Sequence, residues 1–148
     1  MVREYVDALD ETSLVNLVQE LVRIRTPNPP ADYSVISGKM RSLMDSLGLE
    51  VNILEGEKGK PNVVGLWRGA GSGPTLLLDA HMDVVPEGDG WEVDPWEAQI
   101  RDGAIWGRGT ADLKQSLAIM VHVVDTLKKK GFAPRGNLIL SATNDDET

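Results

Sequence analysis

Two short apolar runs constrain the fold of this chain more than any other feature of its sequence. One is TLLLDA at residues 75–80, directly after the turn sequence GSGP, and the other is NLILSAT at residues 137–143. Continuous apolar runs of this length, bounded by turn residues, are typical of buried strands. Between them, residues 115–130 are apolar at helical spacing and stop before Gly131. We therefore predict a fully buried central strand, then a helix, then a last buried strand.

The first half of the chain adds two helices and a pair of strands. Apolar residues recur at helical spacing over residues 14–22 and again over residues 36–47, where Gly48 closes the pattern. The segments VNILE (51–55) and NVVGLW (62–67) are strand-like, and a Gly- and Lys-rich turn separates them. Because helices alternate with buried strands around this β–β segment, the sequence predicts one α/β domain. We expect a mixed β-sheet flanked by helices on both faces.

The composition excludes several classes of partner. With 15 Lys plus Arg against 23 Asp plus Glu, the formal net charge is -8. This charge argues against nucleic-acid and anionic-membrane partners, because both need basic surfaces. The chain has no cysteine, so only oxygen and imidazole ligands could hold a metal. The N-terminus lacks an apolar signal segment and no stretch approaches transmembrane length, so we expect a cytoplasmic protein.

Imidazole and carboxylate residues follow the two apolar runs and one glycine-rich segment. His81 and Asp83 end the first run, Asp146 and Glu147 close the second, and Asp112 lies in GRGTADLKQ before the predicted helix. Ligands of open α/β sheets bind at the carboxyl ends of strands. A divalent metal needs such donors from several segments, and a cation reverses the repulsion of roughly 1–4 kcal/mol between neighbouring carboxylates. Together the three segments predict a metal site.

Each segment taken alone also has a purely structural interpretation. A lone His-x-Asp is more often part of a turn that ends a strand, and Asp112 could equally be the N-cap of the following helix. In favour of a site, residues i and i+2 of a strand share a face, so Asp83 could reach the imidazole of His81. Gly107 and Gly109 could aim Asp112 into a cleft, because glycine adopts conformations closed to other residues.

Three longer motifs resemble the N-terminal signatures of a known family. They are HMDVVP, DPWEAQIRDGAIWGRGTADLKQ and ATNDDET, and the early TPNPP is also similar. The family is the zinc-dependent peptidase and deacylase family of acetylornithine deacetylase, succinyl-diaminopimelate desuccinylase, aminoacylase and glutamate carboxypeptidase. The resemblance covers essentially the whole chain in order and spacing. It implies a zinc-peptidase-like catalytic domain that hydrolyses an amide bond in a small N-acyl amino acid or peptide.

The resemblance also implies a role for each candidate residue. His81 would bind the first of two zinc ions, with cobalt as a substitute metal, and Asp83 would orient His81. Asp112 would bridge both ions, with a cis peptide bond after it, and Glu147 would bind the second ion. Asp146 would be the general base that takes a proton from the attacking water. The family usually has Glu at that position, and the shorter Asp146 retracts the carboxylate by roughly 1–1.5 Å.

In relatives, sequence beyond the position of Glu147 supplies a further acidic ligand, a distant histidine ligand and a smaller lid domain that is often used for dimerisation. We therefore expect residues 1–148 to be a truncated, N-terminal part of the catalytic metallohydrolase domain. The lid/dimerisation domain and the C-terminal part of the catalytic domain would be absent. Catalytic zinc normally has three protein ligands, so we expect weak metal binding and little or no hydrolysis by this chain alone.

Three further expectations follow from the same resemblance. Apolar surface left uncovered would favour self-association into homo-oligomers. One alternative function is that of a non-catalytic fragment or pseudoenzyme that acts as an interaction module. The other is that of a related dinuclear zinc aminopeptidase, although the contexts HxDVVP and GRGxxDxK favour the first family.

Overall fold

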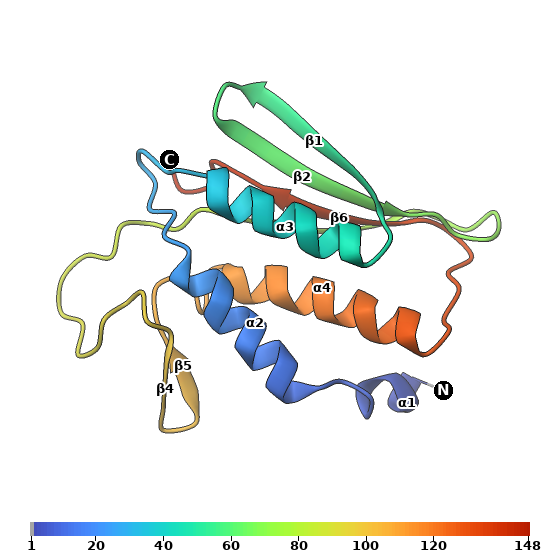
Figure 1. Cartoon of the computed structure of the whole chain (residues 1–148), viewed down its shortest axis with the longest axis horizontal. Helices are drawn as coiled ribbons and strands as arrows, with labels where there is room; N and C mark the ends of the chain where they lie inside the picture. The colour runs from blue at the N-terminus through green and yellow to red at the C-terminus, as the bar shows by residue number, and fades with distance from the viewer. Residues whose placement is uncertain (1) are drawn as a thin grey trace.

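The computed structural model describes residues 2–148 and shows a four-stranded mixed sheet with helices packed against it (Figure 1). The spatial order of the strands is β1-β2-β6-β3. β2 pairs antiparallel with both β1 and β6, whereas β6 pairs parallel with β3. The strands of this sheet are β1 (Glu50–Glu57), β2 (Lys60–Trp67), β3 (Leu76–His81) and β6 (Leu138–Thr143). The prediction of an α/β domain with a mixed sheet is confirmed.

Four helices and a small two-stranded ribbon complete the secondary structure of the described residues. The helices are α1 (Val2–Val6), α2 (Glu11–Arg23), α3 (Ser34–Ser46) and α4 (Lys114–Lys129). The antiparallel ribbon consists of β4 (Gln99–Arg101) and β5 (Ala104–Trp106). The three long helices lie where the apolar spacing predicts them. α2 begins after Asp10, whose carboxylate accepts the backbone hydrogen of Ser13 at 3.1 Å.

The mixed sheet with packed helices agrees with the expectation, and within residues 2–148 the long helices lie on one side of this sheet. Figure 1 shows α2, α3 and α4 on one side, where α3 contacts β1 and β2 while α4 contacts β3 and β6. α2 packs against α4 instead of reaching the sheet. The opposite face leaves Leu54 and Leu77 exposed. An apolar stripe predicts that a helix is buried, but another helix can bury it as well as a sheet can.

β3 is an edge strand of this sheet and not its fully buried centre. It pairs with β6 alone, and Leu76 and Leu77 are 58% and 56% exposed. The end of the strand is different, because Ala80 and His81 are buried. β6 lies between β2 and β3, and most of its residues are buried, as predicted. An apolar run thus indicated a strand in both cases, but not the order in which the strands pair.

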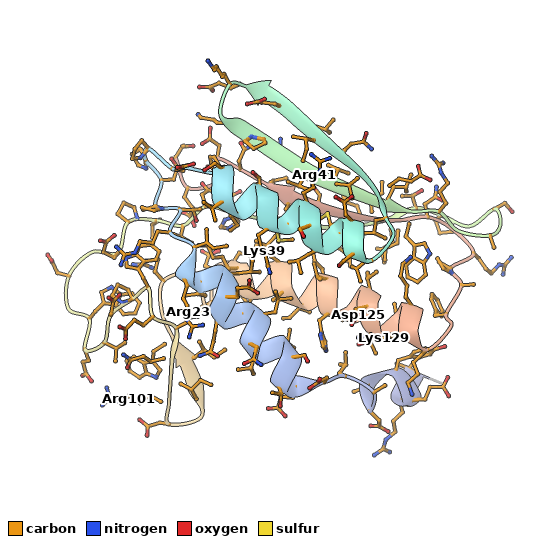
Figure 2. All side chains as sticks on the ribbon, viewed as in Figure 1. Arg23, Lys39, Arg41, Arg101, Asp125 and Lys129 are labelled. Carbon is orange, nitrogen blue, oxygen red and sulfur yellow. The ribbon has the colours of Figure 1, made fainter. Side chains whose placement is uncertain are left out.

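Charged pairs lie on the outer surfaces of the helices. In Figure 2 the labelled side chains of Asp125 and Lys129 lie on the last turns of α4, where Lys129 Nζ is 2.6 Å from Asp125 Oδ2. Lys39 of α3 makes a similar contact of 2.6 Å with Glu20 of α2. Exposed pairs of this kind add little stability. None of the helices within residues 2–148 combines the length and the apolar character needed to cross a lipid bilayer.

Candidate metal centre

The candidate site forms where the parallel strands β3 and β6 end side by side. His81 is the last residue of β3 and pairs with Thr143, the last residue of β6. The backbone hydrogen of Met82 is donated to the carbonyl of Thr143 at 2.7 Å. The segment Asn144–Glu147, named the carboxylate turn below, therefore starts next to His81. Parallel pairing brings together two segments that are more than sixty positions apart in the chain.

His81, Asp112 and Glu147 form the cluster that the sequence predicts. One ligand atom of each residue lies within 4.8 Å of the corresponding atoms of the other two. His81 Nε2 is 3.1 Å from Asp112 Oδ1. His81 is buried, whereas the side chain of Asp112 is 72% exposed, so the cluster opens to solvent on the side of Asp112. One imidazole and two carboxylates are a donor set that suits a divalent cation such as zinc.

Asp83 contacts His81 through its backbone and not through its carboxylate. His81 Nδ1 is 2.9 Å from the backbone oxygen of Asp83 and 3.7 Å from Oδ1 of the same residue. A hydrogen on Nδ1 that is donated to this carbonyl leaves the lone pair of Nε2 free, which is the tautomer of a metal ligand. The imidazole is thus oriented by residue 83, but the atom responsible is the main-chain oxygen.

The carboxylate of Asp83 instead holds the carboxylate turn. It is completely buried and accepts hydrogen bonds from Asn28 Nδ2 at 2.8 Å and from the backbone of Glu147 at 3.0 Å. The backbone nitrogen of Asp146 lies 3.4 Å from the other oxygen of the Asp83 carboxylate and donates its hydrogen to it. A buried carboxylate is stable only when donors surround it. Asp83 therefore links the end of β3 to the segment that carries Asp146 and Glu147.

Asp146 lies at the open edge of the cluster. Its Oδ2 is 3.8 Å from His81 Nε2, and its side chain is 68% exposed. The carboxylate has no tight hydrogen bond among the described residues, so water and a substrate could reach it. This position is compatible with a base that exchanges protons with solvent.

Asp112 is carried by the glycine-rich segment 107–113. Gly109 has a φ of +87°, and an added Cβ there would meet Val84 Cγ1 at 2.9 Å. A Cβ on Gly107 would meet the backbone oxygen of Pro95, also at 2.9 Å. The peptide bond after Asp112 is cis, as the resemblance implied. The N-cap alternative is wrong, because α4 begins after Leu113 and no side chain caps it.

Three residues of the site were missed by the sequence reasoning: Asn28, Tyr33 and Lys60. Asn28 Nδ2 lies 3.1 Å from Asp145 Oδ1, and Lys60 Nζ lies 2.6 Å from Asp145 Oδ2. The hydrogen bond from the Lys60 ammonium lowers the pKa of the Asp145 carboxyl. Burial raises the pKa of Tyr33, so its hydroxyl stays protonated. The only available signal was an asparagine between prolines in TPNPP, which does not reveal its distant partners.

Lys114 lies behind the site and joins the start of α4 to the end of α2. It is fully buried, and Nζ donates a hydrogen bond to the backbone oxygen of Ile24. Burial lowers the pKa of Lys114 to about 7, against the opposing effect of the nearby Asp83 carboxylate.

The other histidine, His122, is buried on α4 and accepts the backbone hydrogen of Asp10 at 3.2 Å. His122 therefore has a structural role, because it joins α4 to the start of α2.

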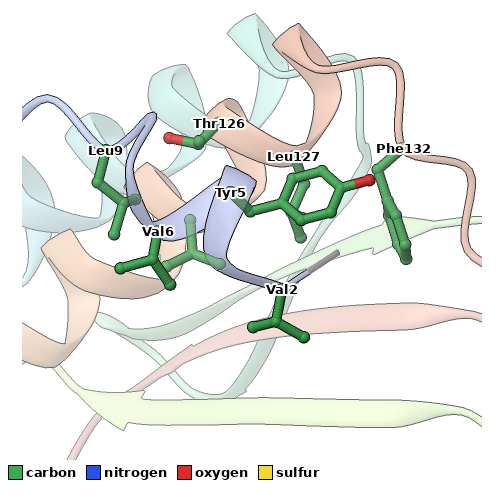
Figure 3. Close-up of a pocket in the computed structure, with 8 residues that line it drawn as sticks. Val2, Tyr5, Val6, Leu9, Thr126, Leu127 and Phe132 are labelled. Carbon is green, nitrogen blue, oxygen red and sulfur yellow. The ribbon is translucent and has the colours of Figure 1, made fainter.

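A second hollow lies at the far end of α4 from the metal cluster. It has a volume of about 420 Å³ and lies between α1 and the last turns of α4, next to Phe132. Figure 3 shows Tyr5, Val6, Leu127 and Phe132 around it. Its lining is almost entirely apolar and contains no carboxylate or imidazole within residues 2–148. This hollow therefore offers no ligand atoms for a metal.

The region that contains the cluster is similar to known proteins. The model of one protein family, described as peptidase family M20/M25/M40, matches residues 77–148, the part of the chain that contains the whole cluster. The succinyl-diaminopimelate desuccinylase of Leptothrix cholodnii is 36% identical over 138 residues. That match covers 90% of this chain and 36% of the relative. The chain spans about a third of the length of the curated relatives it matches.

Solved structures share the fold. A tripeptidase of Staphylococcus aureus is 27% identical with a TM-score of 0.71, over 90% of this chain and 36% of that one. Human carnosine dipeptidase 1 is 20% identical with a TM-score of 0.76, over 88% of this chain and 31% of that one. The fold and the site define the class of zinc-peptidase-like α/β domains. More narrowly, the chain is similar to peptidase family M20/M25/M40 over residues 77–148, in agreement with the resemblance that the motifs carry.

Proposed function

We propose that this chain is the N-terminal part of a zinc-dependent hydrolase that cleaves an amide bond in a small N-acyl amino acid or peptide. The observation that carries the proposal is the convergence of His81, Asp112 and Glu147 within 4.8 Å of one another. The similar proteins, by name a desuccinylase, a tripeptidase and a dipeptidase, support a hydrolytic reaction at an acyl–nitrogen bond. The acid-rich chain also fits a cationic cofactor.

In the proposed reaction His81 and Asp112 would hold one zinc ion, and Asp112 and Glu147 would hold a second. Cobalt would serve as a substitute metal at the same residues. When bound, such ions lower the pKa of water and polarise a carbonyl oxygen. The backbone oxygen of Asp83 keeps the proton of His81 on Nδ1, so that Nε2 is available as a ligand. The Asp146 carboxylate takes the proton of the attacking water and delivers it to the leaving nitrogen.

Aspartate at the position of the general base has a consequence for the rate. Its carboxylate is retracted by roughly 1–1.5 Å relative to glutamate, whereas proton transfer needs heavy atoms about 2.6–3.2 Å apart. Asp146 is exposed and unconstrained at the edge of the cluster, so its side chain can move toward the reacting water. We infer that the aspartate is a competent base with a lower rate than glutamate would give.

The described residues offer only two protein ligands to each of two ions. Catalytic zinc normally has three, and the relatives are about three times as long as this chain. We therefore propose that further ligands lie outside residues 1–148 and that the chain alone binds zinc weakly and hydrolyses little or no substrate. A pseudoenzyme or interaction module, or a dinuclear zinc aminopeptidase, is the competing proposal. Metal content separates the pseudoenzyme from the two zinc enzymes, because a pseudoenzyme predicts that no zinc is held.

Zinc titration of the purified chain tests the metal site. We expect heat release or a shift in melting temperature on addition of zinc, and its loss in His81→Ala. Asn52→Ala is a suitable control, because Asn52 is exposed on β1 and lies outside the cluster. Equal binding by wild type and His81→Ala would contradict the proposed site, and no binding at all would favour the pseudoenzyme.

Hydrolysis is tested with a chimera in which residues 1–148 replace the matching third of the Leptothrix desuccinylase. The chimera should release succinate from an N-succinylated amino acid, and His81→Ala in the same chimera should not. Turnover by the 148-residue chain itself, if it is abolished by His81→Ala, would show that the ligands within the chain are sufficient. A folded, zinc-loaded chimera without turnover would count against the hydrolase.

The uncovered edge of the sheet supports a second, smaller proposal. Leu76 and Leu77 are exposed on the edge strand β3, and exposed apolar edges promote pairing between chains. We expect the chain to self-associate through β3, which size-exclusion chromatography would show as concentration-dependent elution. A charged residue at this edge, Leu77→Lys, should shift the elution toward the monomer.

A further inference from the structure

We propose that Asn28 and Tyr33 are positioning residues that hold the carboxylate turn in the conformation that presents Asp146 and Glu147 to the site. Neither residue belongs to the predicted cluster, and both lie in the loop that precedes α3. The consequence for metal binding depends on the proposed function, whereas the conformational role can be tested without any metal.

The first observation is that every backbone N–H group of the carboxylate turn is bound by a side chain from elsewhere. The hydrogen of Asn144 is accepted by Asn62 Oδ1 at 3.0 Å, and that of Asp145 by the Tyr33 hydroxyl at 2.9 Å. Those of Asp146 and Glu147 are accepted by the two carboxylate oxygens of Asp83. These acceptors come from β2, from the segment that follows β3 and from the loop before α3. The turn thus owes its shape to other segments.

The second observation is the backbone conformation of Asp145. Its φ is +62°, in the left-handed region that non-glycine residues adopt at a cost of about 1–2 kcal/mol. The Tyr33 hydroxyl contacts both its backbone nitrogen and its Oδ1, while Asn28 and Lys60 bind its carboxylate. This strained residue directly precedes Asp146, so it sets the direction in which the next two side chains leave the turn.

The third observation is that one amide of Asn28 joins two carboxylates. Its Nδ2 lies 2.8 Å from Asp83 Oδ2 and 3.1 Å from Asp145 Oδ1. Asn28 is buried, and its two amide hydrogens are donors without charge. Two carboxylates at such distances repel each other, and the shared donor offsets that repulsion. An aspartate at position 28 would instead add a third negative group.

Hydrogen exchange of the metal-free chain tests the conformational role. In Tyr33→Phe, which keeps the ring but removes the hydroxyl, the amides of Asp145 and Glu147 should exchange about tenfold faster than in wild type. Asn28→Ala and the isosteric Asn28→Asp should do the same, because both lack the donor. A role in packing alone predicts that Asn28→Asp behaves like wild type. The exposed Asn52→Ala serves as the control.

If Asn28→Ala does not fold, Lys60→Met decides the question, because that side chain is one-third exposed and binds the same Asp145 carboxylate. Faster exchange confined to residues 144–147 supports the proposal. Unchanged exchange in Tyr33→Phe and Lys60→Met, with the overall fold intact, would overturn it.

Zinc affinity provides the second readout. Loss of a group that positions a metal ligand typically weakens binding by about 10–100-fold, so we expect that loss in Asn28→Ala and a smaller one in Tyr33→Phe. Zinc binding by wild type with the same affinity in both variants would refute the effect on the site. Absence of zinc binding in wild type would refute the proposed function instead, and the exchange data would still decide the positioning role.

Discussion

The two sides of the candidate site are built in different ways. On one side, Asp83 and the carboxylate turn are held by hydrogen bonds from several segments, and Asp83 is fully buried. On the other side, Asp112 is 72% exposed, and His81 Nε2 is the partner of its carboxylate within residues 2–148. Close glycine packing holds the segment that carries Asp112. The hydrogen bonds of the first side are in place before any ion binds, whereas a bound ion would hold the Asp112 side chain on the second side.

This difference has a physical basis. A buried carboxylate without donors is unstable, so every oxygen of Asp83 needs a partner in the folded chain. An exposed carboxylate is solvated by water and needs none until a cation arrives. Substitution of Asp83 should therefore lower stability, whereas substitution of Asp112 should lower metal affinity with little effect on stability.

The largest effect is expected for Asp83→Ala. It leaves the part-buried backbone N–H of Glu147 without its acceptor and removes one of the two carboxylate acceptors of the buried Asn28 amide, which should lower the free energy of unfolding by about 3–5 kcal/mol. Asp112→Ala is the matched variant on the other side and should change it by less than about 0.5 kcal/mol. Urea denaturation measures both. Equal losses in the two variants would remove the distinction between the sides.

Zinc should stabilise the folded chain by a comparable amount. A ligand at one hundred times its Kd adds about 2.7 kcal/mol to the free energy of unfolding. Thermal unfolding should show this gain in wild type, with reversal by a chelator, and its loss in both His81→Ala and Asp112→Asn. A full gain in Asp112→Asn would mean that the exposed side takes no part in binding.

Gly109→Ala should have the next largest effect and tests whether packing holds the side of Asp112. The new methyl group meets Val84 at 2.9 Å and the backbone has a positive φ, so we expect a loss of about 2 kcal/mol in unfolding free energy. Gly88→Ala also has a positive φ, +67°, but an open environment, and should lose about 1 kcal/mol. Identical losses would show that the backbone conformation, and not the close packing, sets the cost.

The smallest effect is expected for Asp146→Asn. Its side chain is exposed at the edge of the cluster, so zinc affinity should change less than about threefold and stability by less than about 0.5 kcal/mol. In the chimera, by contrast, the same substitution should abolish turnover. Normal turnover in Asp146→Asn would exclude this residue as the general base.

Much of the candidate site could be predicted because its candidate ligands occupy positions defined by local pattern. His81 and Glu147 follow two apolar runs, and Asp112 follows two glycines, so strand ends and a turn predicted where each would lie. The role of Asp83 was predicted only in part, since its backbone and not its carboxylate contacts the imidazole. Asn28 was missed because its partners lie 55 and 117 positions away.

The sequence by itself determined the α/β class, the three long helices, the strands and the segments that carry the ligands, because each depends on residues that are neighbours in the chain. The tertiary structure alone decided that β3 lies at the edge, that the helices cover one face, and that Asn28, Tyr33 and Asp83 clamp the carboxylate turn. Such choices depend on which distant surfaces and donors meet in the folded chain. No local periodicity records that outcome.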